Sequence, residues 1–427
     1  MSTFCINPCS KGGLKGNIVV PPSKSHTLRA LLFALMAHGK SYIRNPLCSP
    51  DTDVMIDACR YLGARVNAFP AYLEVEGVGG ILRPAEDVLY VGNSGIAFRF
   101  LAAIAALLPS YTVLTGDPSI RHRRLIMPLL QGLEQLGALA VSARGDGYAP
   151  ILIRGPMRAG HASLSGEDSQ PVSALLIACS FLPEQTTLCV SQPGEKPWID
   201  LTLCWLKKLG LGVECDNYTR YTIQGRGSYQ GFDCSIPGDM SSAAYAIAAA
   251  LITQSELTLH NIDLAAGGDS QFLAILQEMG ASFSIDAENK SIRVQRCDAL
   301  KGMTVDLNDC IDMITLLPVI ACFAKEKTRI VNAQIARAKE SDRIACIAKE
   351  LKKMGACLEE HEDGLLISPS QLTGASVESH SDHRLSLSLS VAALAAQGST
   401  QIAGAACIAK TYPAFQADFN AIGATIS

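Results

Sequence analysis

Basic side chains recur in short loops rich in glycine, serine and aspartate. These loops contain Lys24 and Arg29 in SKSHTLR, Arg121, Arg123 and Arg124 in DPSIRHRRL, Lys339 and Arg343 in AKESDR, His383 and Arg384 in SDHR, and Lys410 in AKTYP. Any one of them could be a solvated surface charge, which is how most lysines and arginines are used. As a set beside apolar segments, they suit a ligand with several carboxylate or phosphate groups, which arginine binds through two hydrogen bonds at once.

Two carboxylates accompany these basic loops. Asp312 directly precedes the apolar segment MITLLPVIACFA, which we expect to form one helix, and Glu340 lies between Lys339 and Arg343. Asp312 could serve only as a helix N-cap, and Glu340 could be an exposed partner of a helical lysine. If both side chains face a basic site from which water is excluded, they become candidates for proton transfer.

Six nearly all-apolar segments follow loops of this kind. A helix that is hydrophobic on every side is buried on every side, so each segment predicts a buried helix. The preceding loops are SKSHTLR, GNSG, SGEDSQ, PGDMSS, NDCID and SHSDH, and the helices are expected from about Ala30, Ile96, Pro171, Ala243, Met313 and Arg384. The start of a helix carries free N–H groups and about half a positive charge. Six such ends with one orientation would favour anionic ligands.

A second, amphipathic helix repeats in the same register and ends in a glycine. The glycines are Gly63, Gly137, Gly210, Gly280, Gly355 and Gly423, about 70 residues apart, which indicates an internal repeat. Glycine just past a helix end is expected in the left-handed conformation. Each repeat therefore predicts a buried helix, an amphipathic helix and strands, with candidate strands at 17–20, 112–114, 187–190, 256–259 and 329–331.

The repeat predicts an α/β fold of two lobes with three units each. A TIM barrel is excluded because its βα unit has only about 30 residues, and a chain of 427 residues exceeds what one hydrophobic core usually serves. Turn residues in GFDCSIPGDM place the change of lobe near Pro237. We expect an N-terminal lobe of residues 22–236 and a C-terminal lobe of residues 1–21 and 237–427.

Charge and composition bear on the partners, the metal binding and the cellular compartment that we expect for this protein. The net charge of −4 gives no reason to expect a nucleic-acid or membrane partner. Fifteen cysteines occur without a CxxC motif or a Cys/His cluster, which favours free thiols, no metal site and a cytoplasmic location. The first residues lack the pattern of a signal peptide, and no apolar run reaches the roughly 18 residues that a membrane-spanning helix needs.

Nine motifs, in order, make the chain resemble the 5-enolpyruvylshikimate-3-phosphate synthase family along nearly its whole length. They are SKSHTLRALLFA, GNSGIAFRFL, LTGDPSIRHRRL, DSQPVSALL, KPWIDLTL, GDMSSAAYAIAAA, ARAKESDRI, SDHRLSLSLSVAAL and AKTYP. The resemblance implies an inside-out α/β barrel with three repeated units per lobe. It implies transfer of the enolpyruvyl group of phosphoenolpyruvate to the 5-hydroxyl of shikimate 3-phosphate, in the shikimate pathway to chorismate and aromatic amino acids. It implies no cofactor, and we expect a monomer acting on small molecules.

The resemblance also implies residue roles by position. Asp312 matches the proton acceptor near the attacking hydroxyl, Glu340 matches the carboxylate that transfers a proton at C3 of the enolpyruvyl group, and Lys24 is the third candidate for catalysis. The residues matched to shikimate 3-phosphate are Lys24, Ser25, Arg29, Ser169, Gln170, Asp312 and Lys339. Those matched to phosphoenolpyruvate are Lys24, Gly95, Arg123, Gln170, Arg343, Arg384 and Lys410.

The chain departs from the family pattern near the expected sugar-phosphate site, at Asp168, Glu195, Trp198 and Ile335. The family usually has Ser at the first two positions, Tyr at the third and Asn at the fourth. Two additional carboxylates would repel a phosphate unless they are turned away or paired. Lys196 and Arg29 are the candidates to pair with them.

Two other interpretations compete with this one. Relatives that transfer enolpyruvate to UDP-N-acetylglucosamine often carry a cysteine in the loop before the arginine matched by Arg123, but TGDPSIRHR has Pro118 near that place and no cysteine. A non-catalytic anion-binding relative would explain Asp168 and Glu195 as signs of decay. Against it, the chain keeps Lys24, Asp312, Glu340, Arg343 and Lys410 together.

Overall fold

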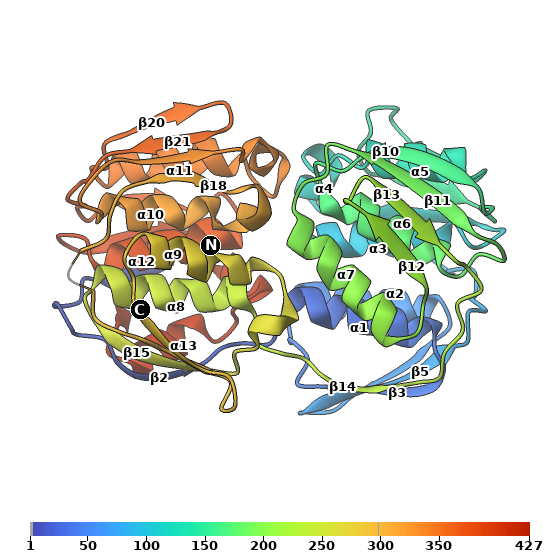
Figure 1. Ribbon diagram of the computed structural model, residues 1–427, viewed down its shortest axis with the longest axis horizontal. Coiled ribbons are helices and arrows are strands. Elements are labelled where there is room, and N and C mark those ends of the chain that lie inside the picture. The colour runs from blue at the N-terminus through green and yellow to red at the C-terminus, as the bar shows by residue number, and fades with distance from the viewer. Residues whose placement is uncertain (1–2, 298) are drawn as a thin grey trace. The chain divides into compact units, whose positions relative to one another are not determined.

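The computed structural model describes residues 3–297 and 299–427, and its strands form six sheets of four strands (Figure 1). In every sheet one outer pair of strands is parallel and the other two pairings are antiparallel. The chain divides into an N-terminal unit, Ser23–Ile236, and a C-terminal unit, Met1–Pro22 with Pro237–Ser427. Each unit holds three of the sheets, so the α/β class and the repeated unit predicted from the sequence are confirmed.

The sheets of the N-terminal unit use segments that are close in sequence, with one exception. Strand β14, at the end of the unit, pairs in parallel with β3 near its beginning. In spatial order the sheets are β14 (Asp233–Ser235), β3 (His38–Arg44), β5 (Tyr72–Val78) and β4 (Arg65–Ala68); β6 (Leu89–Tyr90), β7 (Tyr111–Thr115), β9 (Ile151–Arg154) and β8 (Leu139–Ser142); and β10 (His161–Ser165), β11 (Thr186–Ser191), β13 (Arg220–Ile223) and β12 (Val213–Asp216).

The C-terminal unit takes two strands from the beginning of the chain. Strand β1 lies between β23 and β24, and β2 pairs in parallel with β15. The sheets are β22 (Ser376–Glu378), β23 (Thr400–Ala403), β1 (Thr3–Asn7) and β24 (Thr425–Ile426); β16 (Phe283–Asp286), β17 (Ser291–Val294), β15 (Glu256–His260) and β2 (Lys15–Val19); and β18 (Thr304–Asp306), β19 (Thr328–Val331), β21 (Gly364–Ile367) and β20 (Leu358–His361). Each of the five strand segments expected from the sequence overlaps an observed strand.

Five of the six predicted buried helices are continuous. They are α1 (Lys24–Met36), α3 (Gly95–Ala105), α6 (Ser169–Cys179), α8 (Met240–Ile252) and α12 (His383–Leu394). Each begins before the expected residue, because the preceding loop supplies a side-chain N-cap. These caps are Ser23, Ser94, Asp168, Asp239 and Asp382, and each accepts a hydrogen bond from a backbone N–H in the first turn. The polar loop residues therefore form the first turns of buried helices.

The sixth buried helix is not continuous, and the prediction of one helix over MITLLPVIACFA is wrong. The segment forms a 3-10 stretch, η3 (Asn308–Thr315), followed by the short α10 (Leu317–Cys322). Cys310 has non-helical dihedral angles within the stretch. Pro318 lies in the first turn of α10, where its missing N–H needs no partner, whereas in a continuous helix it would leave a carbonyl unpaired.

The glycine ends of the amphipathic helices behave as predicted. The helices are α2 (Pro50–Tyr61), α5 (Met127–Gln135), α7 (Lys196–Lys208), α9 (Phe272–Glu278), α11 (Arg343–Lys353) and α13 (Phe415–Ala421). Shorter elements are α4 (Pro118–His122), η1 (Leu264–Ala266), η2 (Asp269–Gln271), η4 (Gln334–Ala338) and η5 (Ala405–Lys410). All six predicted glycines have positive φ, from 73° at Gly210 to 110° at Gly63, which confirms their role as left-handed caps.

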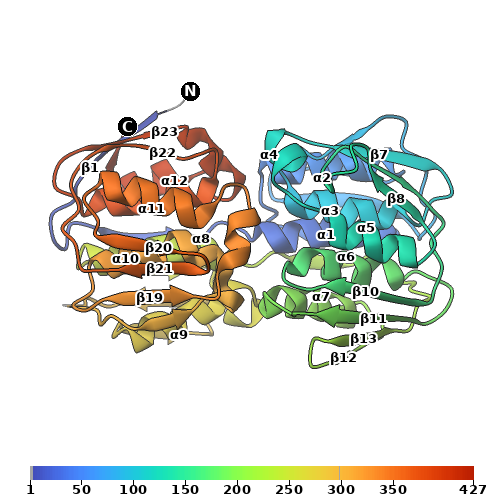
Figure 2. The same ribbon diagram turned by 90° about the horizontal axis from the view of Figure 1, so that it is seen from above.

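Each unit has a hydrophobic core of its own, built around its buried helices. Helix α3 contacts α1 and α6 in the N-terminal unit, and α8, α10 and α12 contact one another in the C-terminal unit. Within each unit the sheets lie outside these helices (Figure 2), which is the inside-out arrangement that the resemblance implied. Among the described residues, no helix is both long and apolar enough to span a membrane.

Candidate active site

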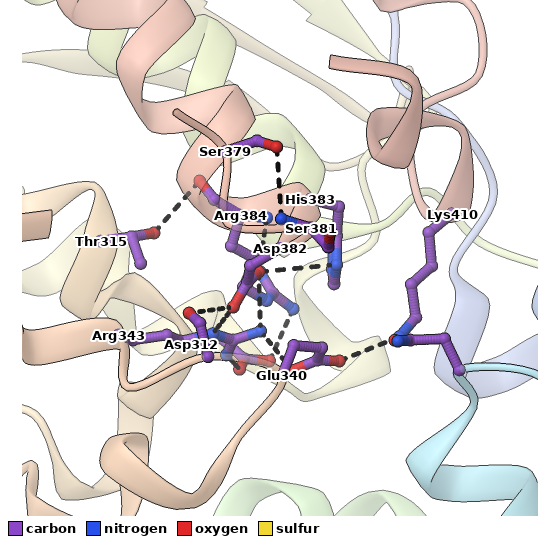
Figure 3. Close-up of polar contacts among 12 residues, drawn as sticks. Asp312, Thr315, Glu340, Arg343, Ser379, Ser381, Asp382, His383, Arg384 and Lys410 are labelled. Atoms are coloured by element: carbon purple, nitrogen blue, oxygen red, sulfur yellow. Dashed lines mark hydrogen bonds and ion pairs between the residues drawn. The ribbon is translucent and has the colours of Figure 1, made fainter. Parts of the chain in front are cut away.

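Arg343 organises a cluster of charged side chains in the C-terminal unit (Figure 3). It is the first residue of α11 and only 1% exposed. Its Nη1 lies 2.6 Å from Asp312 Oδ1, its Nη2 lies 2.8 Å from Glu340 Oε2, and its Nε lies 2.8 Å from Asp382 Oδ2. One guanidinium therefore joins both carboxylates proposed from the sequence to the N-cap of α12.

Two further cations complete this cluster. Arg384 Nη2 lies 2.5 Å from Asp312 Oδ2, and Lys410 Nζ lies 2.9 Å from Glu340 Oε1. We call Asp312, Glu340, Arg343, Asp382, Arg384 and Lys410 the Arg343 cluster. The structure thus brings together three residues matched to phosphoenolpyruvate and two matched to proton transfer. These residues come from separate parts of the chain, namely η3, the loop before α11, the starts of α11 and α12, and the end of η5.

The ionisation of the cluster follows from its pairing. Burial would raise the pKa of Asp312, but Arg384 and Arg343 outweigh it and hold that pKa below the ordinary range of an aspartate. Burial acts against the charge of Arg343, yet Asp382, Glu340 and Asp312 raise its pKa further. Asp312 is therefore an ionised carboxylate at neutral pH and can accept a proton but not donate one.

The predicted residues of the N-terminal unit lie at the first turns of its buried helices. Lys24 begins α1, with Nζ 3.7 Å from Asp51 Oδ2. Gly95 begins α3, and a Cβ there would collide with the guanidinium of Arg124, which is 4% exposed. Arg123, the residue matched by the resemblance, is the exposed C-cap of α4.

Arg29 is a buried cation held by neutral groups. Its Nε and Nη2 lie 3.0 Å and 2.9 Å from Thr202 Oγ1, and its Nη1 donates to the Ser25 carbonyl. Its guanidinium also lies over the ring of Phe100, 5.1 Å from the centroid. It is 2% exposed, and this burial lowers its pKa to about 9. These partners are neutral, so hydrogen bonds and an aromatic ring hold the charge of Arg29 in its buried position.

Comparison with known proteins assigns the family. The model of the EPSP synthase family (3-phosphoshikimate 1-carboxyvinyltransferase) matches residues 10–419. This chain belongs to the EPSP synthase family. The family transfers enolpyruvyl groups in the shikimate pathway, and the chain is an enzyme of that kind. Nothing in the comparisons favours transfer to a nucleotide sugar.

Individual relatives match over their full length. The 3-phosphoshikimate 1-carboxyvinyltransferase of Chlamydia pneumoniae is 41% identical over 429 residues, covering 100% of this chain and 95% of the relative. That of Acetivibrio thermocellus is 41% identical over 418 residues and covers 98% of each chain. A solved EPSP synthase of Acinetobacter baumannii has a TM-score of 0.84 and 28% identity, covering 100% of this chain and 99% of its own.

Two buried carboxylates near the EPSP synthase site residues had no assigned role in the sequence interpretation. Asp382 is fully buried and accepts from Arg343, from Ser341 Oγ and from the Arg384 backbone N–H. Asp269, in η2, is 1% exposed and accepts from Ser241 Oγ. Burial, together with the negative charge of Asp312, raises the pKa of Asp269 to about 7. Asp382 had a detectable signal, because an aspartate before an apolar helix is an N-cap pattern, but Asp269 had none.

The two additional carboxylates of the N-terminal unit do not both have the partners expected from the sequence. Asp168 Oδ2 lies 3.0 Å from Arg99 Nη2, and Glu195 Oε2 accepts from the backbone N–H and the hydroxyl of Ser169. The expected pairing with Arg29 is wrong, because Arg29 donates to Thr202 and backbone carbonyls instead. Lys196 lies over the ring of Tyr218, with Nζ 5.7 Å from the centroid.

The other matched positions lie at or beside helix starts. Ser25 and Ser169 are buried, Gln170 is half-buried in the first turn of α6, and Lys339, 5% exposed, follows η4 and contributes positive charge at Asp312. Trp198 and Ile335 are half-buried. Among the described residues, no group of three or more histidine, cysteine, aspartate or glutamate side chains is arranged to hold a metal ion.

Proposed function

We propose that this chain transfers the enolpyruvyl group of phosphoenolpyruvate to the 5-hydroxyl of shikimate 3-phosphate, and that the Arg343 cluster performs the chemistry. The observation that supports this most is the pairing of Asp312 and Glu340 with three fixed cations. Two candidate proton acceptors and the groups that suit an anionic ligand are thereby held within one network.

The proposed reaction is an addition followed by an elimination. Protonated Glu340 donates its proton to C3 of phosphoenolpyruvate, the 5-hydroxyl attacks the cationic C2, and Asp312 accepts the hydroxyl proton. The tetrahedral intermediate then releases phosphate as C3 returns a proton to Glu340. Lys24 is the third proposed participant in proton transfer. No redox step occurs, so positioning and fixed charge suffice for catalysis.

Because the charges of the cluster are paired with one another, an anionic ligand would change how readily these carboxylates accept a proton. In the cluster three carboxylates form ion pairs with three cations. An anionic substrate competes with Asp312 and Glu340 for Arg343, Arg384 and Lys410. Asp312 then loses part of its pairing with the two arginines that lower its pKa, so its pKa rises and it takes a proton more readily.

The remaining residues are proposed as ligand contacts. For phosphoenolpyruvate these are Lys24, Gly95, Arg123, Gln170, Arg343, Arg384 and Lys410. For shikimate 3-phosphate they are Lys24, Ser25, Arg29, Ser169, Gln170, Asp312 and Lys339. The uncompensated charge of Arg29 and the first-turn positions of Ser25 and Ser169 support the second set, because helix starts bind phosphate through free N–H groups.

Phosphate release tests the proposed reaction. The protein is incubated with phosphoenolpyruvate alone, with added shikimate 3-phosphate, or with added UDP-N-acetylglucosamine. We expect release only with shikimate 3-phosphate. Release only with the nucleotide sugar, or with neither acceptor, would reject the proposal.

We also propose that the enzyme works as a monomer in the cytoplasm. All fifteen cysteines are free thiols, which supports a reducing compartment. Sedimentation at micromolar concentration should give the mass of one chain. A dimer that persists on dilution would contradict the monomer.

A further inference from the structure

Glu195 holds an unusual backbone conformation next to the start of α7. It is 2% exposed and lies in the left-handed region, with φ 48° and ψ 40°. A residue other than glycine rarely adopts this conformation, which persists only where its surroundings maintain it. The carboxylate of Glu195 is held in a defined position by hydrogen bonds.

That carboxylate lies at the start of another helix. Glu195 Oε2 accepts from the Ser169 backbone N–H at 2.9 Å and from Ser169 Oγ at 2.8 Å. Ser169 is the first residue of α6, a helix of 11 residues. Free N–H groups and the positive end of the helix dipole make this position favourable for an anion. In this structure the anion at that position is the carboxylate of Glu195.

These are the donors proposed to bind the phosphate of the acceptor. A phosphate oxygen and Glu195 Oε2 cannot both take the short hydrogen bonds from the N–H and the hydroxyl of Ser169. A serine at position 195 would offer a hydroxyl that can donate to phosphate. A carboxylate can only accept and adds a like charge.

The charges of Asp168 and Arg29 also bear on phosphate binding in this region. Asp168, the N-cap of α6, is a second carboxylate, and its Oδ2 is engaged by Arg99. Arg29 donates through Nη2 to the carbonyl of Trp198, in the first turn of α7, and it has no carboxylate within ion-pair distance among the described residues. The α1–α6–α7 region thus keeps an attraction for phosphate at Arg29 while Glu195 occupies the α6 donors.

We propose that Glu195 is an internal anion that competes with the phosphate of the acceptor for the start of α6, and so determines how strongly the enzyme prefers a phosphorylated acceptor. This inference rests on the proposed function, because it takes Ser169 as a phosphate contact. It makes Glu195 a specificity-determining residue rather than a catalytic one.

Two substitutions separate the charge of Glu195 from its occupancy of the site. Glu195→Gln keeps the size and an oxygen that accepts from Ser169 but removes the charge. Glu195→Ser removes both and restores a donor. We expect the KM for shikimate 3-phosphate to fall about threefold in Glu195→Gln and about tenfold or more in Glu195→Ser, in keeping with the cost of like charges in contact. The kcat and the KM for phosphoenolpyruvate should stay within about twofold.

Shikimate without its phosphate is the discriminating acceptor. Its kcat/KM should be unchanged in both variants, since it does not compete with Glu195, so the ratio of kcat/KM for the two acceptors should rise. Glu184→Ser, at an exposed glutamate outside the site, is the matched control and should change neither acceptor. Calorimetric titration with shikimate 3-phosphate alone should show the same fold-change in Kd.

The outcomes are distinct. An unchanged or raised KM for shikimate 3-phosphate in both variants, with their melting temperatures intact, would overturn the competition and make Glu195 a support for Ser169. An equal change for shikimate would also overturn it, because the effect would not depend on phosphate. Absence of phosphate release by the unsubstituted enzyme would instead reject the proposed function.

Discussion

Arg343 is the residue on which the active-site arrangement depends most. Its three nitrogens contact Asp312, Glu340 and Asp382 at 2.6 to 2.8 Å, so it fixes the orientation of both proposed proton acceptors. The sequence interpretation identified Arg343, Asp312 and Glu340 but not Asp382, which accepts from the Arg343 guanidinium. The contact between Asp382 and Arg343 could not be predicted from the spacing of residues in the sequence, because the two lie 39 positions apart.

Removal of the Asp312 charge tests its role as a base. Asp312→Asn keeps the shape of the side chain but cannot accept the hydroxyl proton, so kcat should fall by about 100-fold or more. Steady-state phosphate release measures this. Glu359→Gln, at an exposed position of β20, controls for the loss of one negative charge and should be near normal. A near-normal kcat for Asp312→Asn would mean that another group is the base.

Asp269 should make stability depend on pH. Its pKa is raised to about 7, so between about pH 4 and pH 7 the folded chain keeps a proton that the unfolded chain has lost. The free energy of unfolding contributed by this group therefore falls as pH rises through that window, by roughly 2–4 kcal/mol in total. Asp269→Asn removes this loss while keeping an acceptor for Ser241.

Urea unfolding of both proteins at pH 5 and pH 8 measures the effect. The stability of Asp269→Asn relative to the unsubstituted chain should increase from pH 5 to pH 8. The other titratable groups are common to both proteins, so their pH-dependent contributions to stability cancel in this difference. A difference that stays constant across the two pH values would show that Asp269 titrates normally.

At the scale of helices and strands, the features that could be predicted from the sequence are those that depend on residues close together in the chain. Glycines after the amphipathic helices and Ser or Asp caps before the buried ones have short-range causes, so the repeat could be derived from the sequence. The break between η3 and α10 was missed, because apolarity alone does not distinguish a continuous helix from a broken one. Pro318 was the available signal. The bond from Ser169 to Glu195 joins residues 26 positions apart and could not be seen in either local pattern.

The left-handed caps give a test of the repeat. Gly137 has φ 84°, and a Cβ there would meet no atom within 4 Å, so Gly137→Ala adds backbone strain without a steric clash. We expect a loss of about 1 kcal/mol in the free energy of unfolding. Gly160 also has open space and no positive φ, so Gly160→Ala should be neutral. Equal effects of the two substitutions in urea unfolding would contradict the cap.

For the whole molecule, the decisive feature is that the chain's two ends belong to one sheet. Strand β1 pairs with both β23 and β24, and the Cys5 N–H donates to the Ser427 carbonyl at 2.8 Å. The sequence repeat predicted a C-terminal lobe made of two segments because the first strand precedes the first buried-helix loop. It could not show that β1 is an inner strand, since pairing over some 400 residues has no local signature.

Circular permutation tests this topology. Joining the two ends through a short glycine linker and opening the chain between Glu288 and Asn289, in the exposed turn from β16 to β17, should preserve phosphate release and cooperative unfolding. Deleting residues 3–7 should abolish cooperative unfolding of the C-terminal unit, because β23 and β24 lose their shared partner. A deletion variant as stable as the full chain would contradict this assignment of β1.

The central claim is that enolpyruvyl transfer proceeds by addition and elimination on shikimate 3-phosphate, and the most direct test is a reaction in D₂O followed by mass spectrometry of the organic product. Adding a proton to C3 and then removing one mixes solvent hydrogen into that carbon. We predict an enolpyruvyl ether of shikimate 3-phosphate with deuterium in its methylene group, and only trace product from Asp312→Asn. An unmodified acceptor, or an enolpyruvyl product free of deuterium, would contradict the account.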